Sequence, residues 1–357
     1  MQYTEYNVLI LGVTISSRVL AQRGRIMCKC LAFIIAYTGI FVFSLIQGQN
    51  HYNPIDINQD NFDIKNLGPV GEWSAKPVWT LTYDSGRNIV FLGSCGCVCI
   101  LDVSDAANPK KISEFKHSQC NTCGLFYQPE KKRLFICDGI SGLKIWNTRQ
   151  PKNPFELGNF DTPGYACAVD VVGTKAYIAD GDGGLRIINV SNPSKPCEIG
   201  HVDMTTACHV HVDRQYAYVA DLGLRIIDVS NPSKPREVAF HSTPGVAYGV
   251  QISNNKAYIA DDWCGLRVID VSNPKKPREI GHLDTPGYAW NIQVSGPLAF
   301  VAAYDGGIRI IDISNATRPR EVAFHDTPDK ALQAITTGSQ IFVAAASKGL
   351  QVYSFGG

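Results

Sequence analysis

The sequence lacks a dominant charge of either sign. Its 33 basic and 32 acidic residues leave a formal net charge of +1 at pH 7. Such a chain has no large single-sign field to attract nucleic acid or an anionic lipid surface. Nucleic acid is therefore not expected as a partner.

Other patterns are missing as well. No segment shows the apolar periodicity of an amphipathic helix, which argues against an α-helical domain. No low-complexity tract occurs, because glycine and proline are spread regularly along the chain. There is no phosphate-binding loop, and Gly124 follows Cys120-x-x-Cys123 where a haem-attachment motif requires histidine.

The N-terminal region has the pattern of an export signal. Leu31 to Ile46 is mostly apolar and follows a basic stretch that ends at Lys29, as in a signal peptide. The apolar run is shorter than the roughly 20 residues that span a bilayer, so we expect cleavage near Gly48. An uncleaved anchor is the alternative, and Met27 is a second candidate for the true start. The protein is thus expected to be periplasmic, secreted or on the cell surface.

One phrase recurs along the rest of the chain. It reads GLRIINVSNPSKP from Gly184, GLRIIDVSNPSKP from Gly223, GLRVIDVSNPKKP from Gly265 and GIRIIDISNATRP from Gly307. Weaker copies begin at Cys97, Gly142 and Gly349. Seven copies at a period of about 42 residues predict an all-β fold, a seven-bladed β-propeller.

Each copy contains four short strands. In the sixth copy, Tyr288 to Val294 alternates in polarity, and LAFVAAYDGG, IRIIDIS and REVAFHDTP follow. Four strands per copy fit a four-stranded antiparallel blade. They are rich in Val, Ile, Tyr and Ala, as expected when both faces of a blade pack on neighbouring blades. Asp-Gly and Gly-Gly pairs at 180–184 and 305–307 supply the positive φ of tight turns.

The seventh copy lacks its own fourth strand. Ile64 to Trp73 precedes the first copy, where a fourth strand would lie, and we expect it to complete the last blade. Closing the ring in this way removes exposed sheet edges. The predicted division is residues 1–50 for the extension and signal, 51–63 for a short linker and 64–357 for the propeller.

The phrase LRIIDVSNP resembles the repeat of the LVIVD-repeat proteins, which are exported and surface proteins. The resemblance covers roughly residues 64–357, and it implies a secreted or surface-associated interaction module. It implies no chemistry, because that family shares no catalytic residues. The first and second copies depart from the pattern, with Cys99 in place of arginine and Trp146-Asn147-Thr148 in place of Ile-Asp-Val-Ser.

Arginine and glutamate recur in each regular copy. The arginines lie in the third strands and the glutamates begin the fourth strands beside them. Cross-strand ion pairs explain this recurrence, and the predicted pairs are Arg186 with Glu198, Arg225 with Glu237, Arg267 with Glu279, and Arg309 with Glu321.

Candidate ligand-binding residues are those that differ between copies. First strands should line the central channel, and their beginnings, with the loops that precede them, form what we call the loop face, where propellers commonly bind ligands. An aromatic and polar patch suited to a protein, peptide or glycan is predicted there. The alternative is that these side chains only fill gaps between blades. The candidates are Trp79, His209, Tyr248, Trp290, Asn291 and Gln333.

The cysteines are concentrated in the first two copies and allow three interpretations. Export favours disulfides among Cys95, Cys97, Cys99, Cys120 and Cys123. Free thiols buried as small apolar side chains are the second interpretation. The third is a zinc or copper site at the channel mouth, formed by Cys123, Cys167, Cys208 and His209.

Weaker signals do not change this interpretation. Asp180-Gly-Asp182 lacks the later glutamate of a calcium loop, so a plain turn is expected. Asn189 and Asn315 are formal glycosylation acceptors. His and Asp residues between 201 and 213 lack a positioned nucleophile. We therefore expect a non-catalytic interaction module without a cofactor, with a metal-binding or redox propeller and a hydrolase or lyase on the loop face as alternatives. Membrane contact is expected only through an uncleaved N-terminal segment.

Overall fold

The computed structural model describes residues 7–10, 13–16 and 67–354, of which the first two segments and Cys120 are described by their backbone alone. The chain divides into two units, 1–57 and 58–357. The described part of the first unit is a hairpin of β1 (Asn7–Ile10) and β2 (Val13–Ser16). The predicted signal at 31–46 and linker at 51–63 lie outside the described residues. Within the described part, no helix is long and apolar enough to cross a membrane.

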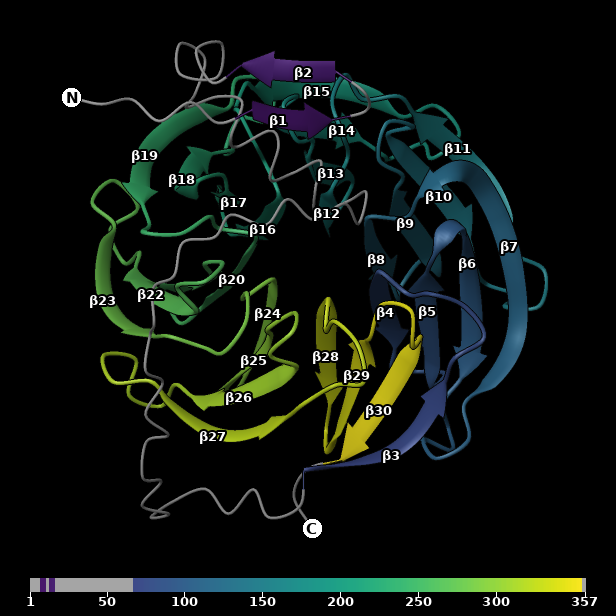
Figure 1. Cartoon of the computed structure of the whole chain (residues 1–357). Coiled ribbons are helices and arrows are strands. Elements are labelled where there is room, and N and C mark those ends of the chain that lie inside the picture. The colour runs from purple at the N-terminus through teal and green to yellow at the C-terminus, as the bar shows by residue number, and fades with distance from the viewer. Residues whose placement is uncertain (1–6, 11–12, 17–66, 355–357) are drawn as a thin grey trace. The chain divides into compact units, whose positions relative to one another are not determined.

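The second unit is a seven-bladed β-propeller of four-stranded antiparallel sheets, as predicted (Figure 1). The first strand of each blade lies nearest the axis and contacts the first strand of the next blade. The last blade contacts the first in the same way, so the ring is closed.

Blades one and two come first along the chain, after β3 (Gly68–Trp73). Blade one consists of β4 (Thr80–Asp84), β5 (Ile89–Gly93), β6 (Cys95–Asp102) and β7 (Lys110–Asn121). Blade two consists of β8 (Gly124–Gln128), β9 (Arg133–Cys137), β10 (Leu143–Asn147) and β11 (Phe155–Phe160). The fourth strand of blade one continues to the loop face, where Asn121 pairs with Cys95.

Blades three to six repeat one plan. Blade three is β12 (Ala168–Val172), β13 (Lys175–Ala179), β14 (Leu185–Asn189) and β15 (Cys197–Val202). Blade four is β16 (His209–Asp213), β17 (Tyr216–Ala220), β18 (Gly223–Asp228) and β19 (Arg236–Ser242). Blade five is β20 (Gly249–Ser253), β21 (Lys256–Ala260), β22 (Leu266–Asp270) and β23 (Arg278–Leu283). Blade six is β24 (Asn291–Ser295), β25 (Leu298–Ala302), β26 (Ile308–Asp312) and β27 (Arg320–His325).

Blade seven is built from both ends of the propeller. β28 (Gln333–Thr337), β29 (Gln340–Ala344) and β30 (Leu350–Ser354) come from the C-terminal end. β3 (Gly68–Trp73) pairs antiparallel with β30, and Trp73 lies opposite Leu350. The predicted closing strand is thus confirmed for its described residues. Phe342 and Val352 of this blade also share a core cluster with Leu92 of blade one.

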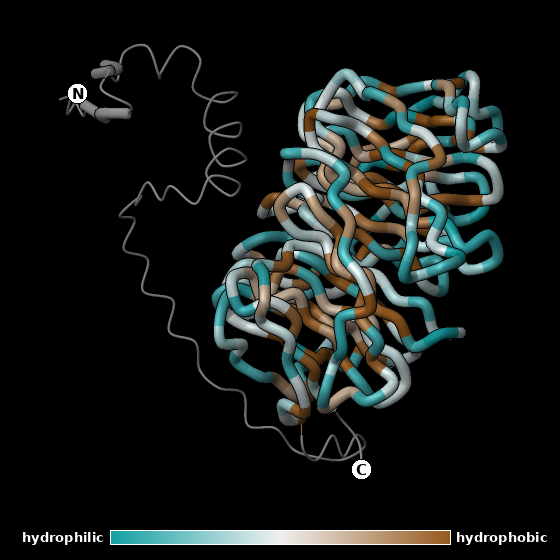
Figure 2. The backbone as a smooth tube through the Cα atoms, turned by 90° about the vertical axis from the view of Figure 1, so that its right-hand side faces the viewer, coloured by the Kyte–Doolittle hydropathy of each residue, from teal (hydrophilic) through white to brown (hydrophobic). Residues whose placement is uncertain are grey.

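The core lies between the blades. The second and third strands are buried on both faces, which explains their almost continuous Val, Ile, Ala and Tyr content. Each adjoining pair of blades shares one apolar cluster, for example Tyr177 and Leu185 of blade three with Val219 of blade four. Figure 2 shows these apolar strands in brown, with hydrophilic loops towards the two faces.

The repeated phrase encodes two turns. Gly184 has a φ of +77°, and a Cβ atom there would lie 2.2 Å from the carbonyl oxygen of Val202. Only glycine fits this position before the third strand. At the other end of the strand, Asp228 Oδ1 accepts hydrogen bonds from Ser230 N at 3.0 Å and Ser230 Oγ at 2.6 Å. This Asx turn ends the strand and begins the Ser-Asn-Pro bend.

The propeller has two faces of different construction. The loop face carries the connections from each fourth strand to the next first strand and from each second strand to its third strand. The opposite face, here the turn face, carries the remaining connections. On the loop face neighbouring connections join through isolated bridges, such as Gly181 with Ala207 and Tyr304 with Ala331. Among the described residues, such bridges join five of the seven neighbouring pairs of blades.

Candidate ligand-binding face

The regular blades hold a repeated ionic network beneath the loop face. Arg225 reaches Glu237 at 2.7 Å and Asp221 at 2.5 Å. In the other three blades the predicted arginine–glutamate distances are 3.7 Å for Arg186, 3.5 Å for Arg267 and 3.8 Å for Arg309. The predicted cross-strand pairs are confirmed. The aspartate that supplies another carboxylate in blades three to five was not predicted.

This aspartate also fixes the loop that precedes each first strand. Asp180 accepts hydrogen bonds from Thr162 Oγ1 at 2.5 Å and Gly164 N at 2.8 Å. Asp261 does the same with Thr243 and Gly245. One buried carboxylate therefore holds both the arginine and the loop. The threonine of the Asp-Thr-Pro-Gly sequence is explained by this contact.

Inner strands of neighbouring blades are connected by side chains that accept backbone N–H groups. Asp170 accepts from Val212 N at 2.7 Å, and Gln251 accepts from Val294 N at 2.5 Å. Gln333 accepts from Leu81 N and Thr80 Oγ1, both at 2.8 Å, across the junction of blades seven and one. The predicted ligand-binding residue Gln333 is thus engaged in closing the ring.

His209 occupies a similar position on the inner strand of blade four. It begins β16, and its ring bonds to the backbone of Val250 on β20. Burial, with a further contribution from His211, lowers the pKa of His209 to about 4. The ring is neutral at pH 7 and joins blades four and five. Trp79 immediately precedes β4 of blade one and is half-buried. Its indole Nε1 is buried and has no hydrogen-bond partner.

An aromatic cluster, defined as Tyr248, Tyr288, Trp290 and Tyr304, lies at the loop face of blades five and six. The Tyr248 and Trp290 rings stack with centroids 4.4 Å apart. Trp290 and Tyr304 are 5.7 Å apart, and Tyr288 meets Tyr304 edge-on at 6.1 Å. These distances are in the range of favourable aromatic pairs. Of the six predicted ligand-binding residues, the structure brings together Tyr248, Trp290 and the adjacent Asn291.

Polar and exposed groups surround the aromatic cluster. The Lys330 ammonium lies 4.6 Å from the centre of the Tyr304 ring. The backbone of Asp262 pairs with that of Ala289, which places the Asp261–Gly265 hairpin beside the cluster. Burial, with a contribution from Asp261, raises the pKa of Asp262 to about 7. Trp263 in this hairpin is 60% exposed and Tyr288 is 44% exposed.

Sequence reasoning missed Tyr288, Tyr304 and Trp263, although a signal was present. Tyr304 stands where blade three has Gly181, and Trp263 stands where it has Asp182. A large aromatic residue at a turn position is not needed by the hairpin itself. Blade six also has Ala303 where Asp180 stands, and the buried Thr285 hydroxyl lacks the partner that the aspartate provides to Thr162.

The two faces carry opposite charge. Exposed aspartates lie in most connections of the loop face. The lysines of these connections are Lys76, Lys330 and Lys348. The turn face has the reverse composition, and its acidic residues are Asp105 and Glu130. The exposed loop-face aspartates are Asp161, Asp182, Asp203, Asp284, Asp305 and Asp326. The exposed basic residues of the turn face include Lys152, Lys195, Arg214, Lys234, Lys275, Lys276 and Arg318. The balanced net charge of the chain conceals this asymmetry.

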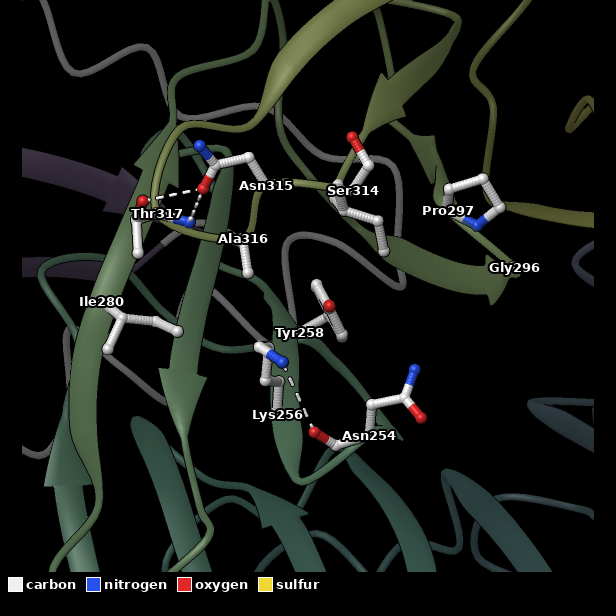
Figure 3. A pocket seen from close by; sticks show the side chains of 11 residues that line it. Asn254, Lys256, Tyr258, Ile280, Gly296, Pro297, Ser314, Asn315, Ala316 and Thr317 are labelled. Carbon is white, nitrogen blue, oxygen red and sulfur yellow. Dashed lines mark hydrogen bonds between the residues drawn. The ribbon is translucent and has the colours of Figure 1, made fainter.

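A pocket of about 520 Å³ opens on the turn face between blades five and six (Figure 3). Tyr258 and Ile280 form part of its apolar lining, and Lys256 is its charged side chain. Asn315 Oδ1 accepts hydrogen bonds from Thr317 N at 3.2 Å and Thr317 Oγ1 at 2.8 Å. These two rim side chains are therefore already paired within their own turn. The aromatic cluster lies on the other face of the same two blades.

Comparison with known proteins identifies the repeat. The model of the LVIVD repeat matches residues 163–204, 205–243, 244–285 and 286–327. These four segments cover blades three to six. The chain carries four consecutive LVIVD repeats. No curated protein sequence matches it.

Solved structures share the fold at low sequence identity. The β-propeller domain of Cps50 (Swd1) from Myceliophteria thermophila has a TM-score of 0.67 at 8% identity, covering 81% of this chain and 99% of that one. The computationally designed Ika8 protein has a TM-score of 0.59 at 11% identity, covering 80% of this chain and 98% of Ika8. These likenesses show the propeller fold of the chain and nothing about its ligand.

Cys95, Cys97 and Cys99 are free thiols in the described part of the chain. The side chain of Cys120 lies outside that part, so a disulfide between Cys120 and Cys123 stays a prediction. Cys97, Cys99, Cys137 and Cys167 are buried, consistent with packing as small apolar side chains. Burial raises the pKa of Cys208 to about 12. Its thiol, like that of Cys167, donates to a nearby backbone carbonyl.

A compact group of potential metal ligands lies in blade one instead of at the predicted position. Among described residues, Cys97, Cys99 and Glu114 are the group whose ligand atoms all lie within 4.8 Å of one another. The predicted set of Cys123, Cys167, Cys208 and His209 forms no such group. A hydrogen bond from Cys99 and the nearby Lys76 ammonium lower the pKa of Cys97 to about 6.

An acid–base arrangement occurs in the same region, beneath the surface. His117 Nδ1 lies 3.3 Å from Asp138 Oδ1, and its Nε2 lies 2.8 Å from Thr122 Oγ1. The side chains of His117 and Asp138 are fully buried, and Thr122 donates its hydroxyl to the carbonyl oxygen of Ser94 at 2.8 Å. A substrate cannot reach this hydroxyl. The arrangement joins blades one and two.

Proposed function

We propose that the protein is a non-catalytic, exported interaction module whose loop face binds a basic segment of a protein partner. The observation that carries this proposal is the aromatic cluster with Trp263 at the loop face of blades five and six. Large aromatic side chains with exposed surface are the residues that contribute most at protein interfaces. A propeller fold is a common scaffold for such interactions.

Charge supports a basic partner. The cluster is surrounded by exposed aspartates, including Asp284 and Asp305 on the connections next to it. Lysine and arginine interact favourably both with carboxylates and with aromatic faces. The contact of Lys330 with Tyr304 is an internal example of the second interaction. A glycan would use the aromatic faces but would gain little from the aspartates.

Export remains a prediction from the N-terminal sequence, and it fits an interaction module that meets partners outside the cytoplasm. The apolar segment 31–46 and the basic residues before it support this part of the proposal. Fractionation of the native host, followed by the intact mass of the protein, tests it. A product that retains residues 27–48 in the cytoplasmic fraction would contradict export.

Peptide binding tests the face. Lysine- and arginine-rich peptides, and acidic peptides of the same length, are titrated into the protein while tryptophan fluorescence is followed. Binding of the basic set only, weakened about tenfold or more by Trp263→Ala or Tyr288→Ala, supports the proposal. Phe155→Ala is the matched control, because Phe155 is 55% exposed on blade two. Binding of neutral glycans without salt dependence would favour the glycan alternative.

The pH dependence of binding should follow Asp262. Its pKa of about 7 means that the carboxyl is neutral below this pH and charged above it. Affinity for a basic peptide should therefore increase as the pH rises through 7, and Asp262→Asn should remove the increase. A pH profile that is identical in Asp262→Asn would exclude this carboxyl from the interaction.

A further inference from the structure

Blade one replaces the ionic network of the regular blades with a cluster of thiols. Cys97 and Cys99 stand in β6 at the positions of Gly223 and Arg225 in β18. Residues two apart on a strand point to the same side of the sheet. Both side chains are buried, with 3% and 1% of their surface exposed.

The surrounding residues change together with the arginine. Ser94 stands where Asp221 stands in blade four, and Lys111 stands where Glu237 stands. The two carboxylates that hold the arginine are thus absent from blade one. A new carboxylate, Glu114, lies directly opposite Cys99 on β7, where blade four has Phe240 opposite Arg225. Blade one has therefore lost the arginine together with both of its carboxylate partners, and it has gained two thiols and a new carboxylate in their place.

We propose that Cys97, Cys99 and Glu114 form a binding site for a soft or borderline divalent metal ion, with zinc as the best fit. The two thiol sulfurs and a carboxylate oxygen already lie within 4.8 Å of one another. In a tetrahedral zinc site, bonds of about 2.0 to 2.3 Å place ligand atoms about 3.5 to 3.8 Å apart. Closing the site therefore needs side-chain shifts of about 1 Å and no movement of the strands.

A cation already lies where the metal would bind. Lys76 Nζ is 3.7 Å from Cys97 Sγ and donates a hydrogen bond to Glu114. Lys111 Nζ lies 3.2 Å from the other carboxylate oxygen of Glu114. The cluster therefore attracts positive charge. The Lys76 side chain is 37% exposed, so it can move into solvent when the metal binds and leave the fourth position to water.

Sulfur and oxygen ligands select among metals. Thiolates favour zinc, copper(I) and cobalt over magnesium and calcium, which prefer oxygen ligands. Each thiol that coordinates the metal gives up its proton to solvent. The site lies in blade one, away from the aromatic cluster of blades five and six. It does not depend on the function proposed for that face.

Cobalt absorption provides a direct test. The full chain, reduced and freed of metal by a chelator, is titrated with Co²⁺, and thiolate-to-cobalt charge transfer is followed in the near ultraviolet. We expect saturation at one equivalent and loss of the absorption on adding zinc. Cys99→Ser should reduce the absorption by at least half, and Cys197→Ser, which alters an exposed thiol elsewhere, should leave it unchanged.

A stability measurement covers the case in which a cysteine variant fails to fold. Zinc at micromolar concentration should raise the melting temperature of the wild-type chain, because it binds only the folded site, whereas magnesium should not. Glu114→Gln retains both thiols and should lose most of this increase. The proposal is overturned if zinc leaves the melting temperature unchanged and no charge transfer appears. It is also overturned if Cys197→Ser lowers the absorption as much as Cys99→Ser.

Discussion

The regular blades, three to six, differ from the closing blades, seven and one, in how they are completed. Each regular blade takes its four strands from one continuous segment and carries the same arginine, glutamate and turn sequence. Blade seven takes β3 from the other end of the chain, and blade one exchanges arginine for thiols. The repeated residues determine the geometry of the ring. Blades seven and one depart from the repeat where the ring is closed and where thiols replace the arginine.

The largest expected effect concerns completion of blade seven. Deleting residues 64–73 removes β3 and exposes the edge of β30 together with the apolar cluster shared by blades seven and one. We expect loss of a single cooperative unfolding transition in calorimetry, because the uncovered β30 edge and the exposed cluster weaken the junction of blades seven and one. Deleting residues 50–60 is the control and should change the melting temperature by no more than a few degrees. Equal damage from the two deletions would contradict closure by this strand.

The next effect compares the same strand position in two blades. Arg267 is 9% exposed on its side chain and lies 3.6 Å from the fully buried Asp261. Replacing it with methionine leaves that carboxylate without its cation and should lower the free energy of unfolding by about 3 kcal/mol. Cys99→Val at the matching position of blade one keeps the volume similar and should cost about 1 kcal/mol. Urea unfolding measures both, and a larger loss for Cys99→Val would show that the thiol is required for stability.

A smaller effect is expected from pH. The pKa of His209 is about 4 in the folded chain, below the value of about 6.5 for an unfolded histidine. The stabilisation is complete above pH 6.5 and is lost as the pH falls from 6.5 towards 4, because only the unfolded chain gains the proton. Allowing for solvent in the channel, we expect a loss of about 2 kcal/mol.

His209→Gln isolates this term from the carboxylates that also titrate below pH 6.5. The difference in free energy of unfolding between wild type and variant should shrink from pH 7 to pH 4. Phe155→Ala, which replaces an exposed side chain that does not titrate, should give a constant difference. A constant difference for His209→Gln as well would mean that its ring takes up a proton as readily in the folded chain as in the unfolded chain.

The fold was predictable because its signals are local and repeated. Seven copies of one phrase indicate the blades, the apolar content of the strands indicates packing on both faces, and Ile64 to Trp73 stands where the last strand is missing. The arginine–glutamate pairs were also predictable, since Arg225 and Glu237 recur at constant spacing in the other regular blades. In each case the repeat itself indicated which residues distant in sequence come into contact.

The site was predictable only in part. Tyr248 and Trp290 were found because they occupy one column of the repeat. Tyr304 lies outside that column, in the hairpin between β25 and β26, and its ring contacts Trp290. Glu114 and Lys76 approach Cys97 and Cys99 from a fourth strand and from the loop before blade one. His209 and Gln333 occupied the predicted column and serve the inner ring instead. The direction of each side chain determines whether it lies at the loop face or joins the inner strands. Strand periodicity alone does not predict that direction.

Hydrogen exchange with a bound lysine-rich peptide tests the proposed binding face most directly. The account predicts slower exchange in the loop-face connections 261–265, 284–290 and 303–307. Exchange in the turn-face connections 271–277 and 313–319 of the same two blades should not change. Protection confined to the turn face, or no protection in the three loop-face segments at saturating peptide, would contradict it.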